Sequence, residues 1–368
     1  MISSQKNISR AEQAQYNLRN LYESYGYSQY KMSKFEEYDL YVRNKSFLVS
    51  DHIITFTDTD GKLMALKPDV TLSIVKNSRI NDGNVRKVYY NENVYRVPKG
   101  GLSFKEIMQS GLECIGSIDK YSVFEVLRLA QKSLETISSD FVLDISHIGI
   151  ISSLIDEMGI STQGKVRLLE CIGEKNVHGI EKVCLDEGKE SLAADKLEKL
   201  LKIRGGCDEM LEILKDSSCY PLAEELSDIV KSLKCDKIRI DFSVIDDTSY
   251  YSGIIFKGFI KGIPSSVLSG GQYDNLMKNM GKNAGAVGFA VYLDLICELC
   301  EETDEYDTDV FVLYDGGCDF AKLCKLVDEL SENGERVMAQ KQIPDRLKYK
   351  RLIKFTKDRA EEDQYGNA

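Results

Sequence analysis

The first clear hydrophobic pattern in the chain predicts a helix near its amino terminus. Apolar residues recur on one helical face from Ala14 to Tyr25, at the spacing that one side of an α-helix requires. Ser9 and Glu12 have the spacing of a capping box, in which both side chains pair with backbone N–H groups at the start of a helix. Gly26 supplies a stop, because glycine adopts the left-handed conformation that ends many helices. We therefore expect a helix between Ser9 and Gly26.

Short segments rich in β-branched and aromatic residues follow this helix and predict an antiparallel sheet. Residues 53–57 and 63–66 flank the sequence Asp-Thr-Asp-Gly at 58–61, which has the chemistry of a hairpin turn. The remaining strand patterns have the same composition and lie at residues 86–90, 112–115, 237–242, 253–260 and 286–291. The sheet is therefore expected to be interrupted and resumed.

The interruption has a helical pattern instead. Many Leu, Lys and Glu residues occupy residues 160–235, with Leu197, Leu200 and Leu201 at helical spacing. Near the carboxyl end, a strand pattern at 310–314 and an amphipathic pattern at 320–330 indicate a small β/α unit. We expect an α+β fold with four parts: a sheet domain begun in residues 1–159, a helical insertion at 160–235, the rest of the sheet domain at 236–303, and a small α/β unit at 304–368.

Composition narrows the class of protein. A chain of 368 residues exceeds the usual span of one core, and no stretch reaches the roughly 20 apolar residues of a membrane span. The amino terminus is polar where a secretory signal is apolar, so a cytoplasmic protein is expected. The net charge of −11 opposes binding of a polyanion such as tRNA, because phosphate contacts need Lys or Arg.

The metal-binding residue types do not form a site that the sequence can identify. Ten cysteines are scattered through the chain, which favours reduced thiols over a disulfide framework. Cys297 and Cys300 have the spacing of a metal-ligand pair, but no second pair lies nearby. His52, His147 and His178 are too few and too dispersed for a relay. We expect no metal and no cofactor.

Three motifs follow one another along the chain. The first reads Leu-Lys-Pro-Asp-Val-Thr at residues 66–71. The second joins Val-Tyr-Tyr-Asn-Glu-Asn-Val-Tyr-Arg at 88–96 to Gln-Ser-Gly-Leu-Glu-Cys-Ile-Gly at 109–116. The third joins Tyr-Tyr-Ser-Gly-Ile-Ile-Phe at 250–256, Gly-Gly-Gln-Tyr-Asp at 270–274 and Gly-Phe-Ala-Val-Tyr-Leu-Asp-Leu at 288–295. In this order and spacing, they resemble the motifs of class II aminoacyl-tRNA synthetases, specifically the histidyl branch.

That resemblance covers residues 10–155 and 236–300 and implies a class II synthetase-like antiparallel sheet flanked by helices. It also implies a homodimer, although Ser33 stands near the place of a proline that the family carries at its dimer helix. Three departures concern the ATP site. Leu295 stands where the family has an arginine, residues 246–249 read Asp-Asp-Thr-Ser in place of Arg-Gly-Leu-Asp, and Pro98 replaces a Glu. Adenylation depends on fixed cations, so their loss should abolish it.

The amino-acid half of the site is retained. The resemblance implies that histidine is bound by Asp69, Thr71, Arg96, Gln109, Glu113, Tyr250 and Tyr251. Asp69 would pair with the ligand ammonium and Arg96 with its carboxylate. Glu113 would accept the imidazole N–H, and Gln109 lies four residues earlier, on the same face if this segment is a strand. Tyr251 would close over the ring.

Structural roles remain open for several of these residues. Asp69 is also what a helix amino terminus favours, because its charge complements the helix dipole. Arg96 is compatible with a structural ion pair, and Tyr251 with ordinary strand packing. An acid and an amide in an apolar segment, such as Glu113 and Gln109, need partners when buried, and a ligand would supply them.

Three functions are compatible with these observations. The chain most resembles the regulatory subunit family of ATP phosphoribosyltransferase, which implies a non-catalytic, histidine-binding protein that joins a short-form catalytic subunit in the first step of histidine biosynthesis. The alternatives are a histidyl-tRNA synthetase or a related amino-acid ligase. Both require an ATP site, which Leu295 and the segment at 246–249 oppose. No pyrophosphate-binding loop of a phosphoribosyltransferase is evident, so the transferase chemistry is expected on another chain.

Overall fold

The computed structural model describes residues 10–48, 52–79, 83–98, 101–189, 192–203, 206–245, 250–297, 306–357 and 359–363. Its contacts divide the chain into two compact units, Arg10–Leu299 and a second unit that contains the chain from Cys300 onward. No helix in the described ranges is both long enough and apolar enough to cross a membrane.

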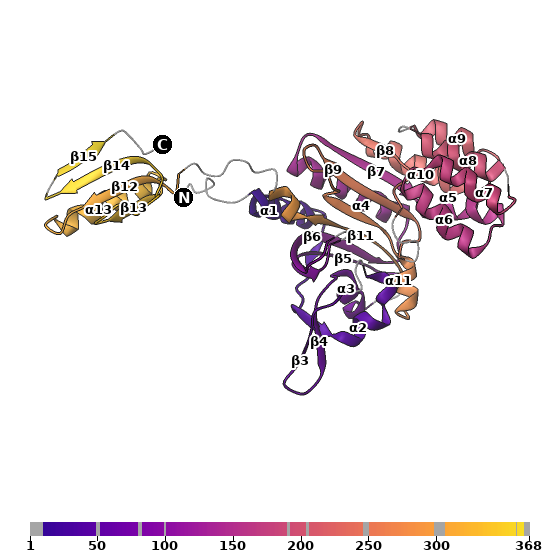
Figure 1. Cartoon of the computed structure of the whole chain (residues 1–368), viewed down its shortest axis with the longest axis horizontal. Helices are drawn as coiled ribbons and strands as arrows, with labels where there is room; N and C mark the ends of the chain where they lie inside the picture. Colours follow the sequence, from indigo (N-terminus) through magenta and orange to yellow (C-terminus); the bar gives the residue numbers. More distant parts are fainter. Residues whose placement is uncertain are drawn as a thin grey trace. The chain divides into compact units, whose positions relative to one another are not determined.

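An eight-stranded sheet organises the larger unit (Figure 1). In spatial order its strands are β1 (Ser28–Gln29), β5 (Val85–Arg96), β6 (Lys105–Gly116), β11 (Gly285–Tyr292), β10 (Leu268–Gln272), β9 (Ile254–Ile260), β7 (Phe141–His147) and β8 (Ile238–Ile240). The outermost pairs, β1 with β5 and β7 with β8, are parallel, and all other neighbours are antiparallel. The predicted α+β fold with an antiparallel-rich sheet is confirmed.

The two faces of this sheet carry separate apolar layers. Helices α1 (Arg10–Ser24) and α4 (Lys120–Ile137) pack on one face, against side chains such as Leu112 and Cys114 of β6. Ile115 alternates to the other face and packs in a second cluster with α2 (Tyr38–Arg43), α3 (Thr71–Asn77) and α11 (Asp274–Asn279). Because strand residues alternate between faces, Gln109 and Glu113 lie on this second face.

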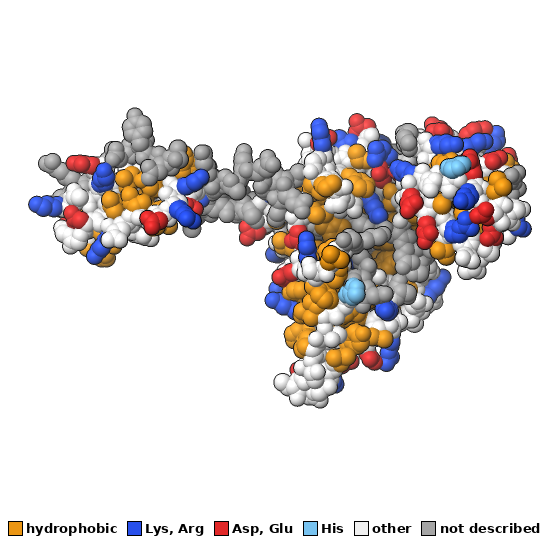
Figure 2. All heavy atoms as spheres, viewed as in Figure 1, with side chains coloured by type: hydrophobic (Ala, Val, Ile, Leu, Met, Phe, Trp, Pro, Cys, Tyr) orange, Lys and Arg blue, Asp and Glu red, His pale blue; other side chains and the backbone are white. Residues whose placement is uncertain are grey.

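A three-stranded sheet packs against the apolar cluster on the second face of the large sheet. Its strands are β2 (Phe35–Glu37), β4 (Leu63–Leu66) and β3 (Thr55–Thr57), in that spatial order. The predicted hairpin is confirmed: Gly61 takes a φ of 84° at the turn, and its N–H donates to the Asp58 carbonyl. The ring centroids of Phe35 and Phe56 lie 5.4 Å apart, and both rings remain exposed. Figure 2 shows hydrophobic side chains gathered around this part of the molecule.

A group of helices lies between β7 and β8 in the sequence and at one end of the sheet in space (Figure 1). They are α5 (Ile148–Met158), α6 (Thr162–Gly173), α7 (Val177–Asp186), α8 (Leu192–Lys202), α9 (Cys207–Leu214) and α10 (Tyr220–Leu233). Ser161 and Asn176 cap two of them by accepting backbone N–H groups with their side chains. The chain then returns to the sheet, where Leu143 pairs with Ile238.

The smaller unit has its own sheet and core. Strands β13 (Val337–Gln340), β12 (Thr308–Tyr314), β14 (Tyr349–Thr356) and β15 (Arg359–Asp363) lie in that order, with α13 (Phe320–Glu332) packed on one face. Val310, Val312 and Ile353 form the centre of that core. The predicted strand and helix at its start are both present.

Candidate functional site

Glu113 lies buried in the middle of the large sheet, with 2% of its surface exposed. It faces Gly288 of β11 in the strand register, and Gly288 in turn faces Gly271 of β10. A Cβ atom at Gly288 would come within 1.8 Å of the Glu113 Oε2 atom, and one at Gly271 within 2.6 Å of the Tyr251 ring. Because neither glycine has a side chain, the Glu113 carboxyl group and the Tyr251 ring can lie close to the sheet at these positions.

Two hydroxyl groups hold the Glu113 carboxyl group. Thr71 Oγ1 donates to its Oε1 atom at 2.7 Å, and the Tyr273 hydroxyl donates to its Oε2 atom. Burial raises the pKa of Glu113 to about 8, although both hydroxyl donors oppose that rise. Tyr273 was not among the residues predicted from the sequence. Its position in the Gly-Gly-Gln-Tyr-Asp motif, at the end of a strand, was the available signal.

Asp69 and Arg96 form the charged side of the site. The Asp69 Oδ1 atom accepts the Leu72 N–H at 2.8 Å, at the start of α3, as expected for an acid at a helix amino terminus. Burial raises the pKa of Asp69, against the opposing effects of that N–H and of the Arg96 charge. Arg96 is 7% exposed, and its Nε atom has no hydrogen-bond partner within the described ranges. The alternative role of Arg96, a structural ion pair, therefore leaves this nitrogen without a partner in the described ranges.

Aromatic side chains wall the site. The ring centroids of Tyr250 and Tyr251 lie 4.6 Å apart, and those of Tyr250 and Tyr273 lie 5.8 Å apart. Phe47 reaches the Tyr250 ring at 5.9 Å from the segment that follows α2. Burial raises the pKa of Tyr250, and the nearby Asp69 charge raises it further. Tyr250 therefore lies between the charged and the apolar parts of the site.

Most of the seven predicted residues come together in one place. Thr71 contacts Glu113 directly, and Arg96 and Tyr250 lie within the electrostatic reach of Asp69. Tyr251 joins through its contact with Tyr250. Gln109 is buried on the same face as Glu113, four residues away along β6, where it faces Tyr292 in the register.

The structure describes some, but not all, of the positions at which the sequence departs from the synthetase motifs. Leu295 lies in α12 (Leu293–Cys297), where its side chain packs against the main apolar core. Residues 246–249 and Cys300 lie outside the described residues. No group of three or more potential metal ligands occurs within the part of the chain that is described.

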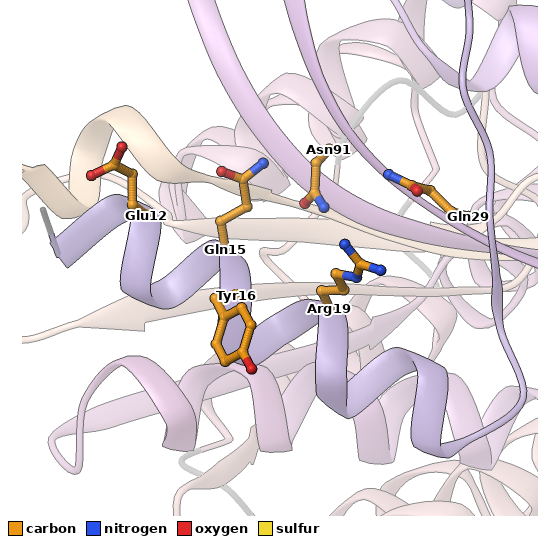
Figure 3. A pocket seen from close by; sticks show the side chains of 6 residues that line it. All are labelled: Glu12, Gln15, Tyr16, Arg19, Gln29 and Asn91. Carbon is orange, nitrogen blue, oxygen red and sulfur yellow. The ribbon is translucent and has the colours of Figure 1, made fainter. Parts of the chain in front are cut away.

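A separate depression of about 300 Å³ lies on the face of the large sheet that is opposite to the candidate site (Figure 3). It is lined by Glu12, Gln15, Tyr16 and Arg19 from α1, with Gln29 from β1 and Asn91 from β5. Its lining includes none of the predicted site residues. Figure 3 shows Gln15 and Arg19 extending from α1 toward Asn91, whereas the ring of Tyr16 turns the other way.

The chemistry of the site suits a small zwitterionic molecule. Asp69 can accept from an ammonium group, Arg96 can donate to a carboxylate, and Glu113 can accept an N–H from a planar ring between tyrosines. The set contains no activated nucleophile. An amino acid with a polar aromatic side chain has the groups that these residues could pair with.

Comparison with known proteins identifies the family of the chain. The sequence profile of the histidyl-tRNA synthetase family matches residues 4–296. The chain is 30% identical to an ATP phosphoribosyltransferase regulatory subunit from Clostridium kluyveri, over 81% of both chains. It is 28% identical to a histidine–tRNA ligase from Methanocaldococcus jannaschii, over 80% of this chain and 73% of the ligase.

Solved structures share the fold. A protein from Bacillus halodurans, described as an ATP phosphoribosyltransferase regulatory subunit or histidyl-tRNA synthetase, aligns with a TM-score of 0.78 and 22% identity over 94% of both chains. A chain of the ATP phosphoribosyltransferase complex from Thermotoga maritima aligns with a TM-score of 0.60 and 21% identity, over 76% of this chain and 96% of that one.

Proposed function

The chain belongs to the histidyl-tRNA synthetase family, which includes the regulatory subunits of ATP phosphoribosyltransferase, and we propose that it is such a regulatory subunit. In this role it binds histidine, joins a short-form catalytic chain, and controls the first step of histidine biosynthesis. In this role it needs no catalytic residue of its own. The C. kluyveri relative supports this role by its name and by its coverage of most of both chains.

One observation carries the histidine pocket: Glu113 is buried and held by Thr71 and Tyr273 in the middle of the sheet. A buried carboxyl group that can still accept another hydrogen bond matches an imidazole N–H. Asp69 would take the ammonium group and Arg96 the carboxylate. Gln109 and the tyrosines at 250 and 251 would enclose the ring.

The residues of this chain give little support for binding a nucleotide as a synthetase does. Leu295 offers no charge to a phosphate and packs into the core, and the acidic segment at 246–249 has the wrong sign for phosphate binding. A histidine-activating enzyme is the second candidate, favoured by the similarity to the M. jannaschii ligase. Histidine-dependent exchange of pyrophosphate into ATP separates the two candidates. We expect background exchange, and robust exchange would establish the enzyme instead.

Calorimetry tests the pocket directly. Glu113→Ala should weaken histidine binding by about 2–5 kcal/mol, because the ligand N–H would lose its buried acceptor. Glu106→Ala is the matched control, since Glu106 lies on the same strand but is exposed. Unchanged binding in Glu113→Ala, with the wild type binding normally, would place the pocket elsewhere.

Steady-state assays of the catalytic chain test regulation. Histidine inhibits only by binding one state of the complex more tightly than the other. Adding this chain should therefore change both the rate and the histidine response, and the catalytic chain's substrates should in turn weaken histidine binding. An unchanged rate where sedimentation detects no complex would refute the regulatory role.

The proposed homodimer would use the outer face of α1 and the adjacent edge strand β1. Tyr16 is 62% exposed there, beside the polar depression of Figure 3. An exposed aromatic ring among side chains that can donate and accept hydrogen bonds is typical of protein interfaces. Sedimentation velocity of Tyr16→Glu should show dissociation toward monomer. A persistent dimer would place the contact on another surface.

A further inference from the structure

The side chain of Tyr41 has a buried hydroxyl group that no described residue satisfies. The residue lies in α2 and is 0% exposed, and its hydroxyl has no hydrogen-bond partner in the described ranges. Buried polar groups are nearly always paired, because burial without a partner costs free energy. A phenylalanine would fill the same apolar cluster without that cost. The hydroxyl therefore requires an explanation beyond packing.

The surroundings of this hydroxyl belong to the candidate site. Tyr41 packs in the same apolar cluster as Val70, Tyr250 and Tyr273. After burial, the Asp69 charge is the next cause that raises the pKa of Tyr41, and Glu36 follows. The hydroxyl is therefore neutral and within electrostatic reach of Asp69, although no hydrogen bond joins the two groups.

The two carboxylates near Tyr41 are not equivalent. Glu36 is already paired, since Ser73 donates to one of its oxygens at 2.8 Å and Lys76 to the other at 2.7 Å. Asp69 accepts only backbone N–H groups, from Leu72 at its Oδ1 atom and from Thr71, and no cation pairs with it directly within the described ranges. A donor with several N–H groups could bridge Asp69 and the Tyr41 oxygen. An ammonium group has three such hydrogens.

We propose that the Tyr41 hydroxyl is a ligand-binding group, which together with Asp69 holds the ammonium group of the bound amino acid. This inference rests on the proposed histidine pocket and adds a residue to it. In the free protein the hydroxyl is unsatisfied, and the ligand satisfies it. Tyr41 therefore lowers the stability of the empty protein and strengthens ligand binding.

Tyr41→Phe removes only this oxygen, so it tests both effects. We expect the full-length variant to bind histidine at least about tenfold more weakly by calorimetry, because the ammonium loses a buried partner. The melting temperature of the ligand-free variant should be unchanged or higher than that of the wild type. Weaker binding without a lower melting temperature is a combination that general damage to the fold cannot produce.

Tyr22→Phe is the matched control. Tyr22 is equally buried, but its hydroxyl lies on the other face of the sheet and is paired with Ser133 Oγ at 3.1 Å. Its removal should lower the melting temperature and leave histidine affinity unchanged.

Ligand analogues identify the group that Tyr41 contacts. Histamine keeps the ammonium group and lacks the carboxylate, whereas imidazole propionate keeps the carboxylate and lacks the ammonium. The loss in Tyr41→Phe should appear with histidine and histamine, and should vanish with imidazole propionate. Equal histidine affinities of wild type and Tyr41→Phe would overturn the inference while leaving the pocket intact. Failure of the wild type to bind histidine would overturn the proposed pocket and the inference together.

Discussion

The protonation of Glu113 links the candidate site to the stability of the whole domain. Its carboxyl group is buried between β5 and β11, and burial raises its pKa to about 8 from an ordinary value near 4.5. Between these two values the folded protein holds a proton that the unfolded chain has lost. The contribution of Glu113 to stability is therefore fully present below about pH 4.5 and is lost as the pH rises through about 8.

Replacing this carboxyl group should alter the dependence of stability on pH. Relative to the wild type, Glu113→Gln should become more stable as the pH rises from 5 to 8.5, by up to about 1.4 kcal/mol per pH unit. Urea denaturation at a series of pH values measures the difference in the free energy of unfolding. A difference that does not vary with pH would show that Glu113 is ionised throughout.

Substitution of Gly288, which lies opposite Glu113 in the strand register, should affect both stability and histidine binding. Gly288→Ala would place a Cβ atom within 1.8 Å of the Glu113 carboxylate and 2.4 Å of the Leu112 carbonyl. We expect a loss of about 1–3 kcal/mol in unfolding free energy, together with a loss of histidine binding. Gly173→Ala is the control, because its Cβ would meet nothing closer than 3.5 Å. A fully stable Gly288→Ala that binds histidine normally would contradict the site geometry.

From the residues alone, without the family resemblance, the sequence points to the candidate site only at positions where a residue type is unusual for its surroundings. Glu113 and Gln109 stand out as polar residues in an apolar segment, and the structure buries both. Tyr41 does not stand out, and Tyr273 is marked only by its place in a motif, because a tyrosine in a sequence gives no indication of what its hydroxyl contacts. Those contacts depend on long-range pairing of strands, which a local pattern does not contain.

At the scale of elements, the first helix and the strands at the predicted positions are present, but β7 and β10 had no predicted strand. The Gly270-Gly271 pair of β10 is usual in turns, yet both residues lie inside the strand, where neighbouring atoms leave no room for a Cβ. Strands β5 and β6 also extend well beyond the apolar segments that predicted them. Pairing between long neighbouring strands, rather than local propensity, sets their length.

A buried ion pair joins the small sheet to the large one. Lys67, directly after β4, is 1% exposed and donates to Glu92 of β5. Lys67→Met should lower the unfolding free energy by up to about 3 kcal/mol, because the partly buried Glu92 carboxylate loses its cation and keeps only the Met32 N–H. The double variant with Glu92→Met should recover much of that loss, which a double-mutant cycle would measure.

The exposed pair of Arg43 and Asp39 is the control for this cycle. Both side chains are more than two-thirds exposed, at 78% and 71%, so Arg43→Met should leave stability unchanged within error. Additive losses at Lys67 and Glu92 would show that the buried pair does not couple the two sheets.

At the scale of the molecule, the candidate site lies in only one of the two compact units. All seven predicted site residues, with Tyr41 and Tyr273, lie within Arg10–Leu299. The smaller unit has its own core around Val310 and Ile353 and its own ion pairs, in which Asp309 bonds to Arg336 and Lys350. Burial opposes ionisation of Asp309, but these two cations hold its pKa well below the ordinary value.

A chain that ends at residue 304 should therefore bind histidine as the full-length protein does. No residue of the pocket is removed, and the apolar clusters on both faces of the large sheet contain no member beyond Ile296. Calorimetry should give dissociation constants within about twofold of each other, since small differences of this kind amount to less than 1 kcal/mol. Circular dichroism would establish that the shorter chain is folded, and the Glu113→Ala substitution in both chains would show that the same pocket is measured. If the shorter chain is folded but has lost histidine binding, the smaller unit must contribute to the pocket. If binding is retained but the catalytic chain no longer responds to histidine, the smaller unit instead belongs to the surface through which regulation passes.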